Sequence, residues 1–403
     1  MRILFLTHRI PYPPNKGDKI RSYNILRHLI KNHEVYLGSL IDEKTDIQYI
    51  AQIQSQVKEF VFETIRPQIK KIFCLRNLLK NESVSVCYFY SSRLQKKIDI
   101  LFNQIDFDVI FCFSSSMAEY YFRSTYKNKA VKPLIRIMDL IDVDSYKWVQ
   151  YAEQATGLKH LIYHYEARYL LQYEHQIAGT FDHLLLVSEQ EKKIFLQGLA
   201  AANLSVVTNG VDLDFFNPCY PQGQQIQKPA LVFTGVMDYW PNIEGVCWFV
   251  ESIFPLIRST FPEVVFYIVG SRPAIKIKNL ERTEGVVVTG FVEDVRDYLS
   301  AAAVCIVPLR IARGIQNKVL EAMAMGKPVV TTLQAFEGIK AVPDEEIITA
   351  ESEESFAAAV INLLKNPAQA QRIGEHARLC VEKHYSWENN LHILDKLLLE
   401  PIS

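Results

Sequence analysis

The sequence contains no long apolar run. None of its stretches approaches the roughly 20 consecutive apolar residues that a membrane-spanning helix needs. The N-terminal segment MRILFLTHRIPYPP has an apolar stretch of only about five residues, and no small-residue cleavage site follows it. We therefore expect neither a spanning helix nor a signal peptide, and we interpret Ile3–Leu6 as a first buried strand.

The sequence also lacks an excess of charge of either sign, since 44 Lys and Arg residues stand against 45 Asp and Glu residues. A near-neutral chain has no overall electrostatic attraction for nucleic acid, so we expect no nucleic-acid partner. The seven cysteines are scattered, without C-x-x-C pairs or zinc-like spacing. This pattern predicts reduced, mostly buried thiols in a cytoplasmic protein.

A further absence is the G-x-G-x-x-G motif after the first strand, which argues against a dinucleotide-dependent oxidoreductase. The sequence instead contains short apolar runs separated by helical stretches, an alternation typical of parallel, doubly wound α/β sheets. A long helix is predicted from about Tyr146 to Ile177. The apolar runs cover residues 3–6, 34–40, 109–113, 133–137, 183–187, 230–235, 264–270, 286–290, 303–309 and 328–332.

The length of 403 residues exceeds what one hydrophobic core usually supports, which predicts two domains. Residues 209–227 are rich in Asn, Gly, Pro and Gln and are interpreted as the hinge between them. We therefore expect an N-terminal domain over residues 1–209 and a second domain over 210–383. A last helix is expected within residues 384–403.

Residues 303–332 are the most informative segment, because they read as strand, Gly-containing loop, helix and strand. The N–H groups that open such a helix have no intrahelical partner, so a phosphate can bind there. Lys318 and Arg313 lie close in sequence to this helix start, and Glu321 is placed to accept hydrogen bonds from sugar hydroxyls. An ordinary βαβ unit with solvated charges remains the alternative.

The same segment resembles the donor-binding signature of family 4 glycosyltransferases, L-E-A-M-A-x-G-x-P-V-V, which residues 320–330 match. Its G-I-x-N-K-V-L-E form, at residues 314–321, is similar to sugar transferases encoded with exopolysaccharide and exosortase (PEP-CTERM) loci. The resemblance implies the α/β GT-B fold, in which two Rossmann-like doubly wound domains face each other across a cleft. It also implies that the helix in residues 384–403 packs back on the first domain.

The resemblance assigns the nucleotide ribose to Glu321. Relatives place a second Glu eight residues earlier to bind the transferred sugar, but this chain has Arg313 there. Relatives also use an Arg and a Lys after the first strand of the second domain to neutralise the leaving diphosphate, and this chain lacks both. We therefore assign that charge to Arg313 and Lys318, with Arg272 in support and with backbone N–H groups at Gly314 and Ile315.

The resemblance implies three further donor contacts. Gly17, in the loop after the first strand, and Gly235, in the loop after residues 230–234, are expected to let the backbone approach the donor phosphates. The G-F-V loop that contains Phe291 and Val292 is expected to contact the nucleobase, mainly through backbone groups. Asn242 is interpreted as a cap of the helix that follows Gly235.

The segment IMDLIDVDSYKW is unusually acidic for a loop after an apolar strand. Many family 4 enzymes have a His in this region that touches the sugar, and since none is present we assign sugar or acceptor contacts to Asp139 and Asp142. The alternative is a D-x-D metal site at residues 142–144, a pattern that residues 212–214 also match. We expect no metal or other cofactor.

Residues 66–97 form a basic segment with eight Lys or Arg residues, one Glu and several interleaved apolar residues. Such a segment is able to lie on an anionic membrane leaflet, although a plain solvated helix face fits the pattern equally well. A membrane contact would place the protein on the inner face of the plasma membrane.

The sequence thus predicts a glycosyltransferase, an enzyme of class EC 2.4, that uses a nucleotide diphosphate sugar as donor. The expected acceptor is a hydroxyl of a lipid-linked glycan in exopolysaccharide biosynthesis, with retention of configuration implied by the family. Two alternatives remain at this stage: a nucleotide-sugar-binding protein without turnover, and an NAD-dependent Rossmann oxidoreductase.

Overall fold

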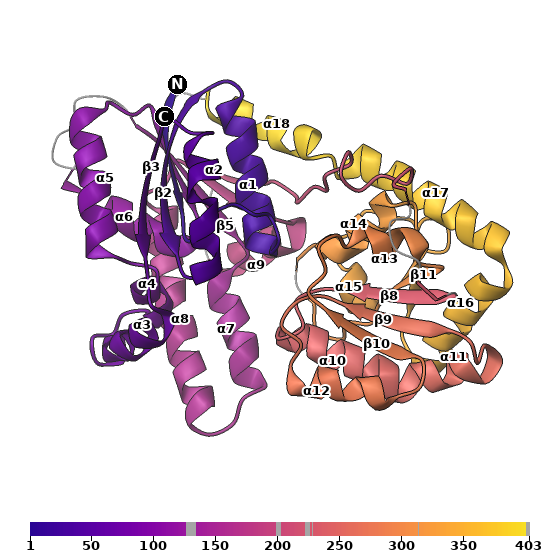
Figure 1. Ribbon diagram of the computed structural model, residues 1–403. Helices are drawn as coiled ribbons and strands as arrows, with labels where there is room; N and C mark the ends of the chain where they lie inside the picture. The colour runs from indigo at the N-terminus through magenta and orange to yellow at the C-terminus, as the bar shows by residue number, and fades with distance from the viewer. Residues whose placement is uncertain (126–133, 199–202, 222–225, 228, 313, 400–403) are drawn as a thin grey trace. The chain divides into compact units, whose positions relative to one another are not determined.

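The computed structural model describes residues 1–125, 134–198, 203–221, 226–227, 229–312 and 314–399. The chain forms two compact units (Figure 1). Unit 1 comprises Met1–Val207 and the segment from Leu391 onward, and unit 2 comprises Thr208–Asn390. In the described part of the chain, no helix has the length and apolar character required to cross a membrane.

Unit 1 is built on a parallel sheet in which β1 pairs with β2 on one side and with β4 on the other. The core strand β4 is buried at every position, because helices cover both faces of a parallel sheet. The seven described strands follow the order β3 (Glu59–Thr64), β2 (Glu34–Ile41), β1 (Arg2–Thr7), β4 (Val109–Phe113), β5 (Ile135–Ile141), β6 (His183–Leu186) and β7 (Leu204–Val206).

The helices of unit 1 connect these strands and are mostly short. They are α1 (Gly17–Ile30), η1 (Lys44–Tyr49), α2 (Ile50–Gln54), α3 (Pro67–Cys74), η2 (Leu75–Leu79), α4 (Val84–Tyr88), α5 (Ser92–Gln104), η3 (Ser115–Met117), α6 (Ala118–Phe122), α7 (Asp144–Glu153), α8 (Leu158–Ala178) and α9 (Glu189–Gly198).

The prediction of one long helix from Tyr146 to Ile177 is wrong, because α7 ends at Glu153 and α8 begins at Leu158. Gly157 adopts a φ of 61° between them, a left-handed conformation that glycine accepts without steric cost. The two helices therefore form a hairpin, seen in the lower part of unit 1 in Figure 1.

Unit 2 repeats the parallel architecture with β8 at the centre of a second sheet. Its core strands are again buried throughout. The six described strands follow the order β10 (Val286–Gly290), β9 (Val265–Val269), β8 (Ala230–Thr234), β11 (Val304–Val307), β12 (Val329–Thr332) and β13 (Ile348–Ala350). The prediction of two parallel, doubly wound α/β units is confirmed.

The helices of unit 2 begin with the continuous run α10 (Trp240–Trp248), η5 (Phe249–Ile253) and α11 (Phe254–Thr260). The last helix, α18, starts in unit 2 and ends in unit 1. The remaining helices are α12 (Ile275–Asn279), η6 (Leu280–Arg282), α13 (Arg296–Ala301), α14 (Asn317–Ala324), α15 (Leu333–Phe336), α16 (Glu353–Lys365), α17 (Pro367–His384) and α18 (Trp387–Leu397).

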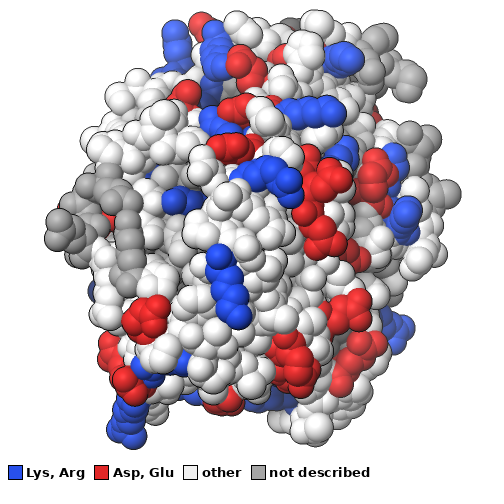
Figure 2. Space-filling model, turned by 90° about the vertical axis from the view of Figure 1, so that its right-hand side faces the viewer, with Lys and Arg blue, Asp and Glu red and all other residues white. Residues whose placement is uncertain are grey.

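The surface carries charges of both signs. Figure 2 shows Lys and Arg interspersed with Asp and Glu on one face, and neither sign covers that face. This distribution agrees with the balance of 44 basic against 45 acidic residues.

The expectation that all cysteines are reduced is wrong for two of them. Cys74 and Cys87 form a disulfide, with their Cα atoms 5.7 Å apart. The other five cysteines are unpaired, and of these only Cys219 is exposed. Spacing alone did not reveal the pair, because the 13-residue separation resembles no known metal or redox motif.

Candidate active site

The candidate donor site of unit 2 lies at the carboxyl ends of β8, β9 and β11, where open parallel sheets bind their ligands. Gly235 follows β8 and Gly270 follows β9, and their backbones touch. A Cβ atom added to Gly270 would lie 1.6 Å from the Gly235 carbonyl oxygen, and one added to Gly235 would lie 2.8 Å from Asn242 Nδ2. A side chain at Gly270 would therefore collide with backbone, and one at Gly235 would displace the Asn242 side chain.

Lys318, in the first turn of α14, projects into this edge. Its Nζ donates to Asn242 Oδ1 at 2.7 Å and lies 4.8 Å from the centre of the Phe233 ring. Asn242 is 3% exposed, and its Nδ2 donates to the Val236 carbonyl at 2.8 Å. The Asn242 amide is thereby fixed at both ends, so it holds the ammonium group of Lys318 in place.

The interpretation of Asn242 as a helix cap is wrong. Asn242 lies inside α10, which starts at Trp240, and the cap position belongs to Tyr239 without any side-chain hydrogen bond. Residue type alone suggested a cap, because Asn is favoured there. Its partner Lys318 lies 76 residues away in sequence, which no local pattern indicates.

Lys318 and Glu321 share one face of α14 and shift each other's titration. Burial lowers the pKa of Lys318 to about 8, and the nearby Glu321 carboxylate opposes this change. Burial likewise raises the pKa of Glu321 to about 7, and the nearby Lys318 ammonium opposes it. Perturbed groups of this kind concentrate at functional sites.

The loop before α14 contains the other residues assigned to the diphosphate. Gly314 adopts a φ of 59° and its carbonyl accepts from Gln316 Nε2 at 3.3 Å. Ile315 is 6% exposed, so its side chain belongs to the core and only its backbone is available. Arg313 lies outside the described residues. The cap residue Gln316 makes no side-chain hydrogen bond to the N–H groups that open α14.

Three further predicted donor residues flank the edge of the same sheet. Arg272 has a φ of 57°, is half-exposed, and lies 3.8 Å from an Asp238 carboxylate oxygen. Phe291 is 76% exposed just after β10, whereas Val292 packs partly against the core of the unit. A largely exposed Phe at the end of a strand leaves an aromatic face free for a ligand.

In unit 1, Asp139 is fully buried in an ion pair with Arg21. Arg21 donates from Nε to one carboxylate oxygen at 2.8 Å and from Nη2 to the other at 3.2 Å. Arg21 also donates to the Val207 carbonyl at 2.7 Å. Because both Asp139 oxygens are engaged and the residue is 0% exposed, we correct its assignment from substrate contact to structural support.

Asp142 lies nearby, in the loop after β5, and is partly exposed. The preceding Ile141 has a φ of 70°, an uncommon conformation for a β-branched residue and one that often marks a functional loop. In the alternative D-x-D pattern, one Asp144 carboxylate oxygen accepts from Ser115 Oγ at 2.6 Å. Among the residues the structure describes, no group of three His, Cys, Asp or Glu side chains is arranged to hold a metal.

The loop after β1 holds His8 and Arg9, which the sequence did not single out. His8 Nε2 lies 3.1 Å from an Asp18 carboxylate oxygen, and Arg9 bridges Asp18 and Asp42 at 2.6 and 2.9 Å. The bond to His8 and the charge of Arg9 hold the pKa of Asp18 well below its usual value despite burial. Gly17 is exposed at the start of α1, beside this network.

Residues 228–366 match the family model of glycosyl transferases group 1. The matched domain lies within unit 2 and is similar to that family. That domain includes Gly235, Gly270 and all of α14, so the lysine and glycines described above lie inside the matched region.

Relatives of this glycosyltransferase extend the likeness to the whole chain. It is 22% identical over 395 residues, 95% of this chain and 96% of the relative, to a Klebsiella pneumoniae protein named "Uncharacterized 44.6 kDa protein in cps region". It is also 22% identical over 320 residues, 73% of each chain, to the Escherichia coli UDP-Gal:alpha-D-GlcNAc-diphosphoundecaprenol alpha-1,3-galactosyltransferase.

Among solved structures, Anabaena HepE in complex with UDP and glucose matches with a TM-score of 0.69 at 15% identity, covering 99% of this chain and 100% of that one. The chain has the GT-B fold and is a glycosyltransferase, which confirms the fold and the enzyme class expected from the sequence.

Proposed function

We propose that this glycosyltransferase moves a sugar from a nucleoside diphosphate sugar to a hydroxyl of a lipid-linked glycan, with retention of configuration, during exopolysaccharide synthesis. The printed names of its relatives support the substrate classes, since one acts on a diphosphoundecaprenol-linked sugar and another was solved with UDP and glucose. The relative from a cps region supports the exopolysaccharide context.

The observation that carries the proposal is the fixed ammonium group of Lys318 at the carboxyl edge of the unit 2 sheet. With a pKa of about 8, the amine is mostly protonated at neutral pH. Asn242 holds it 2.7 Å away, and the touching backbones of Gly235 and Gly270 keep side chains out of this part of the edge. A positioned cation beside a helix start suits a diphosphate.

In the proposed reaction the bond between the anomeric carbon and the donor phosphate oxygen breaks, and a bond to the acceptor oxygen forms. The proton of the acceptor hydroxyl passes to the leaving diphosphate, so no protein base is required. Lys318, Arg313 and the N–H groups after Gly314 stabilise the charge that develops on the diphosphate, which lowers the barrier. Glu321 holds the ribose, and Asp142 orients the sugar or acceptor.

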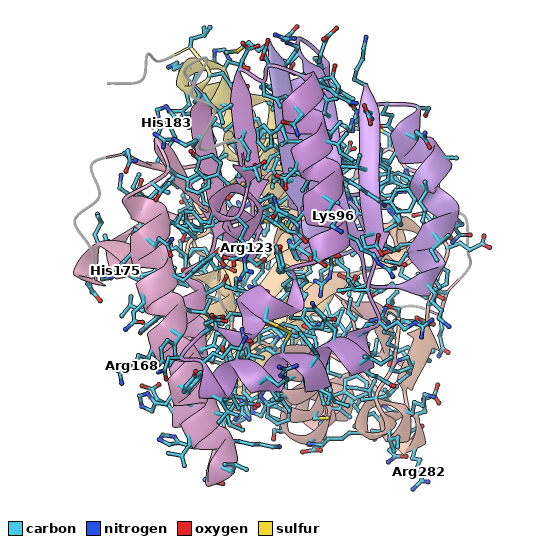
Figure 3. All side chains as sticks on the ribbon, turned by 90° about the vertical axis from the view of Figure 1, so that its left-hand side faces the viewer. Lys96, Arg123, Arg168, His175, His183 and Arg282 are labelled. Atoms are coloured by element: carbon cyan, nitrogen blue, oxygen red, sulfur yellow. A yellow bond between two sulfur atoms is a disulfide. The ribbon has the colours of Figure 1, made fainter. Side chains whose placement is uncertain are left out.

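The acceptor class suggests a contact with a membrane, and α3 and η2 of unit 1 fit that role. Five of their apolar side chains are 49 to 90% exposed: Ile69, Ile72, Phe73, Leu75 and Leu79. Lys71, Arg76 and Lys80 are exposed among them. Figure 3 shows the side of unit 1 that also carries the cations Lys96, Arg123 and Arg168. Apolar residues interleaved with cations match an anionic leaflet.

The donor site predicts a test with Lys318→Ala. Turnover should fall by roughly two orders of magnitude, the scale of losing one preorganised charge contact, while the fold is retained. Arg313→Ala should behave in the same way. Turnover is measured with UDP-, GDP- and ADP-sugars and a polyprenyl diphosphate-linked sugar as acceptor, with and without EDTA, and NMR of the product establishes the anomeric configuration.

The matched control is Lys278→Ala, which removes an exposed lysine from α12 of the same unit. This variant should keep its turnover. Unchanged turnover in Lys318→Ala would overturn the assignment of that residue. Donor binding without transfer to any acceptor would favour a nucleotide-sugar-binding protein, and a requirement for magnesium would restore the D-x-D alternative.

A further inference from the structure

The α3–η2 segment, residues 66–80, rests on unit 1 almost without a core of its own. Cys74 is the only buried residue of α3, and η2 contributes no buried residue. Hydrogen bonds supply part of the attachment: Lys70 Nζ donates to the Tyr90 carbonyl at 2.7 Å, and Tyr165 Oη donates to the Asn77 carbonyl at 2.9 Å. The Cys74 side chain is therefore the main anchor of α3.

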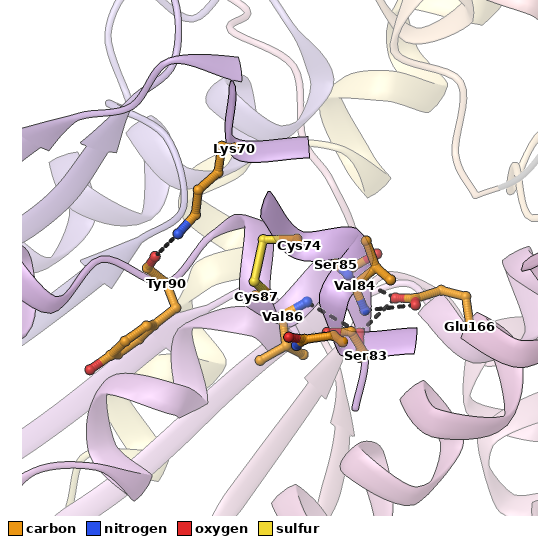
Figure 4. The surroundings of a disulfide bond; sticks show 10 residues. Lys70, Cys74, Ser83, Val84, Ser85, Val86, Cys87, Tyr90 and Glu166 are labelled. Carbon is orange, nitrogen blue, oxygen red and sulfur yellow. Dashed lines mark hydrogen bonds between the residues drawn. A yellow bond between two sulfur atoms is a disulfide. The ribbon is translucent and has the colours of Figure 1, made fainter. Parts of the chain in front are cut away.

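The partner of Cys74 lies on a firmly held element. The buried carboxylate of Glu166 in α8 accepts from Ser83 Oγ at 2.6 Å and from the backbone N–H groups of Val84 and Ser85 at 2.8 Å each (Figure 4). These bonds satisfy the N-terminus of α4 and tie it to α8. The disulfide from Cys87 thus connects an exposed, weakly packed helix to a fixed one.

We propose that the Cys74–Cys87 disulfide is a redox-controlled clasp that holds the α3–η2 segment in its membrane-binding conformation. The inference rests on the membrane contact proposed above. While the clasp is closed, the exposed apolar side chains are presented on an ordered backbone. Once the disulfide is reduced, the segment loses its fixed conformation. The membrane must then order it again, and the entropy lost in that ordering weakens binding.

The chemistry of opening is a two-electron reduction by a small dithiol. Its thiolate attacks the sulfur of Cys87, which is partly exposed, whereas Cys74 is fully buried. The S–S bond breaks, a mixed disulfide forms on Cys87, and Cys74 leaves as a thiolate that takes up a proton. The second thiol of the reductant then displaces Cys87 as a thiol, and the dithiol ends as its own disulfide.

The first experiment uses the full chain without membranes. Alkylation of the denatured, unreduced protein should modify five thiols, and prior reduction should raise this to all seven. Hydrogen exchange over residues 67–79 should be at least tenfold faster after dithiothreitol. Seven modified thiols before reduction, or exchange that reduction leaves unchanged, would overturn the clasp whether or not the protein binds membranes.

The second experiment measures co-sedimentation with phosphatidylglycerol vesicles, with phosphatidylcholine vesicles as the uncharged comparison. The oxidised protein should bind the anionic vesicles at least tenfold more tightly than the reduced protein. Faster exchange on reduction without vesicle binding in either state would refute the membrane contact and this use of the clasp. Equal vesicle affinity in both states would refute the redox dependence alone.

Two variants separate the disulfide from other thiol effects. Cys74→Ser should bind vesicles as weakly as the reduced protein and should not respond to dithiothreitol. Cys219→Ser removes an exposed, unpaired cysteine from unit 2 and should keep the full response. A redox response that survives in Cys74→Ser would exclude this disulfide as its source.

Discussion

At the scale of single residues, the candidate donor site depends on a buried amide that no motif identifies. Asn242 contributes no charge, yet it fixes Lys318 while its own Nδ2 is bound to a carbonyl. Groups held in this way are already oriented when the substrate arrives, which reduces the entropy lost in reaching the transition state. Asn242 is therefore a positioning residue.

Asn242→Ala should lower kcat by at least tenfold, because Lys318 loses its hydrogen-bond acceptor while its charge remains. Asn242→Asp keeps an oxygen acceptor for Lys318 and should recover part of the loss. Steady-state kinetics with separate donor-binding measurements provide the check. Equal kcat for Asn242→Ala and the unsubstituted enzyme would remove the positioning role.

The residues of unit 2 were more predictable than those of unit 1. Lys318 and Glu321 lie together at the sheet edge. Their position follows from the sequence, because the order strand, loop, helix places the start of the helix at the carboxyl end of the strand. The burial of Asp139 was not predictable, since its partner Arg21 lies 118 residues away and looks like a solvated cation in sequence. Long-range ion pairs leave no local signal.

At the scale of elements, the prediction worked for strands with strongly apolar runs, such as β1, β4 and β9. It missed β3, β7 and β13, which have few buried positions and lie at the edges of their sheets. It also joined α7 to α8, because the apolar pattern continues across Gly157. Tertiary packing, which periodicity does not report, decides such cases.

The α7–α8 hairpin contains an acid with a testable pH dependence. Glu174 in α8 accepts from the Ser145 backbone N–H at 3.0 Å and from Ser145 Oγ. Burial raises the pKa of Glu174 to about 8, although the bonds from Ser145 oppose the change. The folded state therefore holds a proton that the unfolded state has released above about pH 4.5.

Because the folded state binds more protons in this window, stability must fall as the pH rises through it. We expect the free energy of unfolding to drop by about 2 kcal/mol between pH 6 and pH 8 from this group alone. Glu174→Gln, which cannot ionise, should show a smaller drop in urea titrations. Glu189→Gln, an exposed change in α9, should keep the full drop. If the unsubstituted protein and both variants lose the same stability between pH 6 and pH 8, Glu174 is not the source of the drop.

At the scale of the whole molecule, α18 starts in unit 2 and its second half belongs to unit 1. His28 of α1 lies 2.8 Å from an Asp395 carboxylate oxygen, which attaches the helix to unit 1. Four leucines in and just after α18 are buried, with exposures of 6% or less: Leu391, Leu394, Leu397 and Leu398. Residues 391–398 thus pack on unit 1.

Leu394→Ala should destabilise unit 1 by about 2–5 kcal/mol, the usual cost of truncating a fully buried leucine. Leu399→Ala, at a position that is 79% exposed, should change stability by no more than about 0.5 kcal/mol. Chemical denaturation of both variants provides the comparison. Similar unfolding midpoints would show that α18 does not contribute to the core.

The contact between Gly235 and Gly270 has a consequence for how this protein is able to diverge. A Cβ atom at Gly270 would collide with the Gly235 backbone, and one at Gly235 would collide with the hydrogen-bonded Asn242 side chain, so the constraint is independent of the donor that a descendant uses. Residues that choose the base or the sugar are free to change, whereas these two positions are not. In a saturation library selected for a new donor, both should return as glycine in every survivor.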